Sequence, residues 1–169
     1  MGEGRAFSPS AVHVIRTAQQ INVQLSSMAD QKASILMGAA FVIFTLAINQ
    51  ARSATPPLPL LILGGSAFVA AVFAVLAIMP AARPGKGNGA PNLLFFGSYA
   101  ALPEEEYVET MLATVADDET AFRAMLRDMH QNGRVLARKK YRMLGWAYRA
   151  FLIGMTASLV AFVAERLAI

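Results

Sequence analysis

The chain has 169 residues, of which 56% are hydrophobic and 15% are charged, and its formal net charge is +4 at pH 7. Soluble domains have about 25% charged residues, so this composition excludes a disordered chain and differs from that of an ordinary soluble domain. Cysteine is absent, which excludes a disulfide framework, a thiolate zinc site and a catalytic thiol. We therefore expect an all-α membrane protein with three transmembrane helices and helical cytoplasmic segments, whose positive charge favours the lipid bilayer over nucleic acid.

The N-terminal segment, residues 1–32, is predicted to form an amphipathic helix from residue 8 onward. Ser8 is placed to cap this helix and Pro9 to occupy its first position. Apolar side chains recur along it at alternating spacings of three and four residues, as in a coiled-coil seam. The seam is expected to pack either on another copy of the chain or on the second polar segment, and the sequence does not distinguish between these two alternatives. Its members are Ala11, Val14, Ala18, Ile21, Leu25 and Met28.

Three long apolar runs are predicted to cross the membrane, because a crossing helix needs about 20 mostly apolar residues. They occupy residues 33–51, 58–80 and 143–165, and a short external loop, residues 52–57, joins the first two. Three of the 15 Lys and Arg residues precede the first run, and nine lie in segment 83–142. Since positively charged segments remain in the cytoplasm, the N-terminus and this segment are predicted to be cytoplasmic.

Small residues are spaced by four along the apolar runs. Such rows let helices approach closely, either within one subunit or between subunits. They are Ala67 with Ala71, Ala70 with Ala74, and Ala150 with Gly154 and Ser158.

The cytoplasmic segment 81–142 is predicted to be a linker followed by a helical hairpin. Pro103 and the three glutamates after it are typical of a helix start, where acidic side chains complement the helix dipole. Asp117 or Asp118 is placed to cap the second helix, which can run on into the last span. Each helix carries an apolar stripe that is expected to be buried: Tyr107, Val108, Met111, Leu112 and Val115 on the first, and Phe122, Met125, Leu126 and Met129 on the second.

Arginines gather on one face of that second helix and its continuation. At about 100° per residue they fall within a narrow arc, and each planar guanidinium can bind phosphate through two parallel hydrogen bonds. One interpretation is that they anchor lipid headgroups and pair with nearby acidic residues. The other is that they form a ligand site for the phosphate of a nucleotide. The candidate ligand-binding residues are Arg123, Arg127, Arg134, Arg138 and Arg142.

The sequence shows no pattern that predicts catalysis or metal binding. His13 and His130 are isolated, with no partner at metal-ligand spacing. The centres of the three apolar runs hold no carboxylate that could relay protons. We therefore expect no catalytic residue, no metal and no cofactor, and we interpret the chain as a membrane protein that is not an enzyme.

Four short segments occur in a particular order relative to the predicted spans. They are Asn22–Leu25 running into Ala29–Leu36, then Asn92–Gly97, Leu102–Tyr107 and Lys139–Leu144. In these segments the chain resembles the transmembrane effectors of Pycsar antiphage defence, over roughly residues 12–165.

The resemblance implies a function that the periodicity does not give. It implies a membrane effector activated by a cyclic pyrimidine nucleotide, cCMP or cUMP, that a partner cyclase makes. The activated effector is expected to impair the bacterial inner membrane and so cause abortive infection. A homo-oligomer is among the expected partners, with the seam as the candidate contact between copies. The alternative function is a structural membrane adaptor that recruits a partner through its N-terminal helix.

Overall fold

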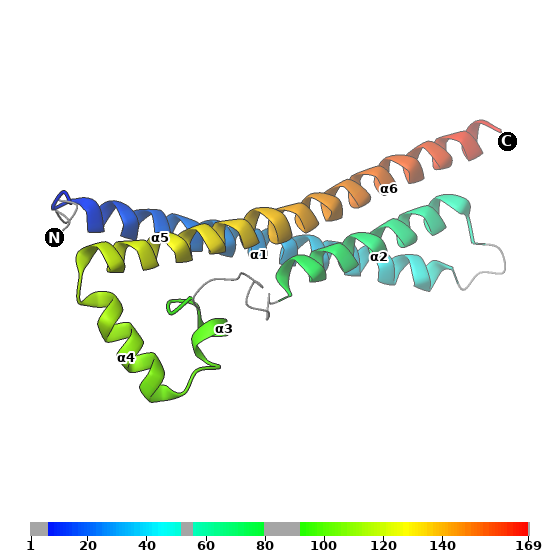
Figure 1. Ribbon diagram of the computed structural model, residues 1–169. Coiled ribbons are helices and arrows are strands. Elements are labelled where there is room, and N and C mark those ends of the chain that lie inside the picture. The colour runs from blue at the N-terminus through cyan, green and yellow to red at the C-terminus, as the bar shows by residue number, and fades with distance from the viewer. Residues whose placement is uncertain (1–6, 52–55, 80–91, 169) are drawn as a thin grey trace. The chain divides into compact units, whose positions relative to one another are not determined.

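The computed structural model describes residues 7–51, 56–79 and 92–168, and every regular element within these ranges is a helix. Three helices are long and apolar enough to cross a membrane, which confirms the predicted all-α fold with three spans. Residues 52–55 of the predicted external loop, Pro80 and residues 81–91 of the predicted linker lie outside the described residues. In chain order the elements are α1 (Ala11–Gln50), α2 (Leu58–Ile78), α3 (Phe96–Tyr99), α4 (Glu104–Val115), α5 (Asp118–Val135), the π-helical segment η1 (Leu136–Tyr141) and α6 (Arg142–Leu167) (Figure 1).

The described chain divides into two compact units. The first holds the residues up to Leu25 together with residues 92–136, and so contains α3, α4 and α5. The second holds Ser26–Met79 and the residues from Ala137 onward, and so contains α2, most of η1 and α6. Helix α1 contributes its first part to one unit and its remainder to the other.

Helix α1 begins later than the sequence predicts. The Ser8 carbonyl accepts a hydrogen bond from the Ala11 amide at 2.9 Å, and the Ser8 hydroxyl accepts one from the Ser10 amide at 3.3 Å. These bonds close a turn, so the predicted helix start at Ser8 and Pro9 is wrong. From Ala11 the helix continues for 40 residues to Gln50, because this stretch contains no proline that would break it. The predicted N-terminal helix and the first apolar run are therefore one continuous helix.

In the second unit, α2 and α6 pack through small residues, which let two backbones approach closely. Of the predicted small-residue rows, Ala67, Ala70 and Ala74 are buried on α2, and Gly154 and Ser158 are buried on α6. Ala71 and Ala150 are partly exposed at the margins of these faces.

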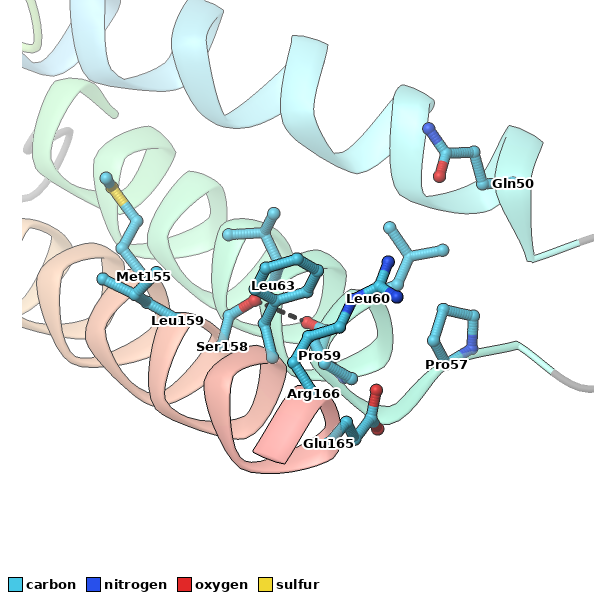
Figure 2. A pocket seen from close by; sticks show the side chains of 11 residues that line it. Gln50, Pro57, Pro59, Leu60, Leu63, Met155, Ser158, Leu159, Glu165 and Arg166 are labelled. Atoms are coloured by element: carbon cyan, nitrogen blue, oxygen red, sulfur yellow. Dashed lines mark hydrogen bonds between the residues drawn. The ribbon is translucent and has the colours of Figure 1, made fainter. Parts of the chain in front are cut away.

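Two glycines mark close approaches between helices of this unit. A Cβ atom on Gly154 would overlap the side chain of Ser66 on α2, and one on Gly64 would lie 2.8 Å from the Cβ of Ala47 on α1. Near the start of α2, the Ser158 hydroxyl donates a hydrogen bond to the Pro59 carbonyl at 2.7 Å (Figure 2). Many large apolar side chains remain exposed along the same helices, as expected for surfaces that face lipid.

In the first unit, α4 and α5 form the predicted hairpin. Helix α4 follows Pro103 and has three glutamates in its first turn. Asp117 caps α5, because its Oδ2 accepts a hydrogen bond from the Thr120 amide at 3.1 Å. The ring of Phe7, which precedes α1, packs edge-on against Phe122 of α5 with 4.8 Å between ring centroids.

The predicted apolar stripes of this hairpin are only partly covered, and none of their residues is fully buried, which corrects the expectation that they are buried. Helix α4 has no buried residue, and its Val108, Leu112 and Val115 are exposed. On α5, Leu126 is exposed, and the buried residue is Asp128. The physical reason is that two helices in a hairpin cover only a narrow line of each other, so a broad apolar face needs a further layer to bury it.

Gly154→Ala is expected to weaken the packing of α2 on α6, because a Cβ atom has no room beside Ser66. Overpacking of this kind costs about 1–3 kcal/mol. Gly145→Ala is the matched control, since it lies on the same helix and its Cβ would meet nothing within 4 Å. Thermal unfolding of the purified proteins in detergent should give a lower midpoint for Gly154→Ala than for Gly145→Ala. Equal midpoints would contradict the close approach.

Candidate functional site

The predicted arginine face is distributed over three consecutive elements. Arg123, Arg127 and Arg134 lie on α5, Arg138 lies in η1, and Arg142 is the first residue of α6. The Arg123 guanidinium is paired with the Glu119 carboxylate, with Nε and Oε1 2.9 Å apart. The other four side chains are exposed, and the described part of the chain places no acidic group in an ion pair with them. These four arginines are therefore accessible to an anion.

The π-helical segment η1 changes how these arginines are arranged. A π-helix closes its hydrogen bonds between residues i and i+5 and so has more residues per turn than an α-helix. The predicted arc assumed an uninterrupted advance of about 100° per residue from Arg123 to Arg142. That assumption is wrong across residues 136–141. The face predicted for α5 therefore cannot be extended to Arg142 by counting.

Two adjacent lysines of η1 connect the three long helices of the second unit at one end. The Lys140 ammonium lies 2.6 and 2.8 Å from the two Asp30 carboxylate oxygens and 2.8 Å from the Ser26 hydroxyl, all on α1. The Lys139 ammonium donates instead to the carbonyl of Met79, directly after α2, at 2.7 Å. We call Ser26, Asp30, Met79, Lys139 and Lys140 the span junction.

The span junction was not predicted as a unit. From the sequence, Lys139 and Lys140 are noted only as members of a positively charged segment and of the Lys139–Leu144 segment, because no periodic pattern signals a π-helical segment. Asp30 and Lys140 do lie in two of the four segments on which the family resemblance was based. Those segments are far apart in sequence, and the contact between Asp30 and Lys140 brings them together in the structure.

A second polar contact holds the segment around Asn92 against α5 in the first unit. The Asn92 amide group donates to Asp128 Oδ1 at 3.0 Å and to Gln131 Oε1 at 2.9 Å. The Asn132 amide group donates to the other Asp128 oxygen at 3.0 Å. Asp128 is only 8% exposed, and hydrogen bonds from two amides satisfy its buried carboxylate. The sequence offered no signal for this contact beyond its position in the Asn92–Gly97 segment.

The predicted seam residues of α1 mostly face outward. Val14, Ile21, Leu25 and Met28 are exposed, and Ala18 is partly buried. The buried residues of the same helix lie at other positions, beginning with Ile15 and Ala29. The seam is therefore a surface feature of the described chain.

A groove of about 740 Å³ lies in the second unit, among the end of α1, the start of α2 and the last turns of α6 (Figure 2). Its walls are mostly proline, leucine, methionine and phenylalanine side chains. Among the described residues that line it, Arg166 is the only cation; its guanidinium lies 5.5 Å from the Phe162 ring centroid, and it adjoins Glu165. A phosphate there would meet a carboxylate, so the groove suits hydrocarbon better than a nucleotide.

Comparison with known proteins gives the family. The Pycsar effector protein domain matches residues 13–165, which include most of α1 and the whole of α2, α4 and α5. The chain belongs to the Pycsar effector family. This confirms the resemblance drawn from the four sequence segments.

The Pycsar effector protein PtPycTM of Propioniciclava tarda is 30% identical over 115 residues, which are 64% of this chain and 55% of that protein. The chain thus spans about half the length of this curated relative. No solved structure matches the chain. Two findings therefore describe this chain: it belongs to the Pycsar effector family, and it has three helices that are long and apolar enough to cross a membrane.

A double-mutant cycle of Asp30→Asn and Lys140→Gln should detect energetic coupling across the span junction. The side chains are 40% and 19% exposed, respectively, so we expect a coupling in the range of about 0.2–1 kcal/mol, typical of partly exposed ion pairs. Thermal or denaturant unfolding of the four proteins in detergent measures it. Replacing Lys140→Gln by Lys139→Gln gives the control cycle, which should show no coupling because Lys139 contacts the Met79 carbonyl. Equal coupling in the two cycles would contradict the assigned contacts.

Proposed function

We propose that this chain is the membrane effector of a Pycsar system, activated by cCMP or cUMP from a partner cyclase to impair the bacterial inner membrane. The observation that carries the proposal is the family match over residues 13–165. Impairing the membrane would stop growth before phage spread, which is abortive infection. In this proposal the chain acts by conformational change and catalyses no reaction.

The charge distribution supports an orientation with the N-terminus in the cytoplasm. Nine Lys and Arg residues lie in segment 83–142 and three precede residue 33, and positively charged segments remain on the cytoplasmic side. This orientation would place α4 and α5 where a cytoplasmic cyclase releases its product. The groove beside Arg166 would then lie toward the outer surface.

The exposed arginines are the best candidates to bind the nucleotide phosphate. Arg127 and Arg134 of α5 and Arg138 of η1 are exposed and have no ion pair within the described ranges. Arg142 is the next candidate along the chain, while Arg123 already has a partner in Glu119. The guanidinium of any one of these residues could hold the phosphate through a charge-assisted hydrogen bond.

The span junction offers a route from bound ligand to the spans. Helix α5 continues through η1 into α6 without a break in the chain, and η1 carries the two lysines that contact α1 and the end of α2. A nucleotide that binds more tightly to one arrangement of η1 would shift the population toward it. The contacts of Lys139 and Lys140 would change with that shift.

Dye release from liposomes that contain the purified protein tests the proposal. Addition of cUMP, cCMP, cAMP or cGMP separately should cause release with a pyrimidine nucleotide only. Failure of all four nucleotides to cause release by correctly inserted protein would overturn direct activation.

Variants then test the arginine assignment. Arg134→Ala and Arg138→Ala should each raise the nucleotide concentration for half-maximal release by about tenfold or more, since a hydrogen bond to a charged group contributes about 1.5–3 kcal/mol. Arg166→Ala is the control, because this arginine is at the other end of α6. An unchanged response in both variants would show that the phosphate is bound elsewhere.

A further inference from the structure

Helix α1 carries large apolar residues at a strict spacing of seven. They are Val14, Ile21, Met28, Ile35 and Val42, which we call the outer stripe of α1. All five are exposed, with accessible fractions between 40% and 67%. The buried residues of this helix lie on a different face: Ile15, Ala29, Ala33, Leu36, Ala40 and Ala47.

The first part of the outer stripe lies outside the hydrocarbon core. Residues 11–32 include Arg16, Asp30 and Lys32 as well as several glutamines, and charged groups are costly inside a bilayer. Val14, Ile21 and Met28 are therefore surrounded by water unless a protein surface covers them. Exposure of such side chains to water is unfavourable, whereas lipid can cover Ile35 and Val42.

The spacing indicates that the covering surface is another long helix. A straight α-helix has 3.6 residues per turn, so positions seven apart drift by about 20° for each heptad. A stripe kept at strict sevens over five positions faces one partner only if the two helices wind around each other with a left-handed supercoil. A compact globular partner would not require this repeat.

The membrane makes a second copy of α1 the natural partner. Copies of a membrane protein cross the bilayer in the same direction, because the same charge bias sets the orientation of each. Their α1 helices are therefore parallel and at the same depth. The outer stripe of one copy meets the same residues of the next, as a symmetric contact requires.

The charges beside the stripe are compatible with this pairing. Thr17, Gln24 and Gln31 each follow a stripe residue by three positions and are uncharged, so parallel copies bring no like charges together there. When the alternating spacing of the seam is continued past Met28 to Val42, Lys32 is the single charged residue at its positions from Val14 onward. One lysine at such a position fixes the register and the number of helices in a coiled coil, at some cost in stability.

We propose that α1 pairs in parallel with α1 of a second copy along the outer stripe, from the water-exposed segment into the membrane. The inference deepens the proposed function by naming the partner surface. It rests on the membrane placement in that proposal and not on nucleotide binding.

Single-cysteine crosslinking in membranes tests the pairing, and the chain suits it because it contains no cysteine of its own. Val14→Cys, Ile21→Cys and Met28→Cys should each give a disulfide-linked dimer on mild oxidation. Val23→Cys is the matched control, since Val23 is 70% exposed and lies on the same helix away from the stripe. We expect at least fivefold more dimer at the stripe positions than at residue 23.

Several outcomes would overturn the pairing. They are equal crosslinking at residue 23, no dimer at any stripe position, or a crosslink to a different protein, which would favour the adaptor alternative. A second measurement guards against misfolded variants: Ile21→Asp should reduce the oligomer seen by light scattering in detergent, while Val23→Asp leaves it unchanged. An oligomer unchanged by Ile21→Asp would also overturn the inference.

The same membranes separate this inference from the proposed function. Stripe-specific crosslinking without any nucleotide-dependent dye release would support the pairing and contradict direct activation. Nucleotide-dependent dye release without stripe-specific crosslinking would support direct activation and contradict the pairing.

Discussion

Close approach of the spans is the constraint on which the membrane part of this protein depends. Lipid tails are as apolar as leucine, so helices in a bilayer associate through packing and hydrogen bonds rather than through hydrophobic exclusion from water. Here Gly154 leaves room for Ser66, Gly64 leaves room for Ala47, and the Ser158 hydroxyl donates to the Pro59 carbonyl. These contacts hold α2 close to α6 and to α1. The large apolar side chains are then left for the surfaces that face lipid.

Polar contacts connect the same helices at one end, where the chain leaves the apolar segment. Lys140 contacts Asp30 and Ser26, and Lys139 contacts the carbonyl after α2. Both lysines belong to η1, and π-helical segments occur often at functional sites. Lys139 and Lys140 are successive residues of this segment, so their side chains leave it in different directions and contact different helices. A few hydrogen bonds at this end of the bundle therefore connect all three long helices.

The sequence predicted the features that follow from composition and helical periodicity. Long apolar runs indicated the three spans, the spacing of small residues indicated much of their packing, and Asp117 was correctly predicted as one of two caps for α5.

Features that depend on tertiary contacts were missed. Nothing in the periodicity signals η1, so the arginine arc was extended past Leu136 with the wrong angle. The apolar positions of α4 identified an amphipathic helix, but such a pattern does not say whether the chain itself covers the stripe. The contact of Asn92 with Asp128 joins residues 36 apart, and no local rule could pair them.

The continuity of α1 has a mechanical consequence. Its 40 residues make a rod about 60 Å long at 1.5 Å per residue, and about half of that length suffices to cross the hydrocarbon core. The other half projects beyond the core as a stiff lever whose pivot is in the bilayer. A tilt of about 10° within the membrane would swing the far end of this lever through about 5 Å. A small change in the tilt of α1 among the spans would thus displace its amino end by several ångströms. Conversely, a displacement of several ångströms at the amino end would change the tilt of the membrane-spanning part by only a few degrees.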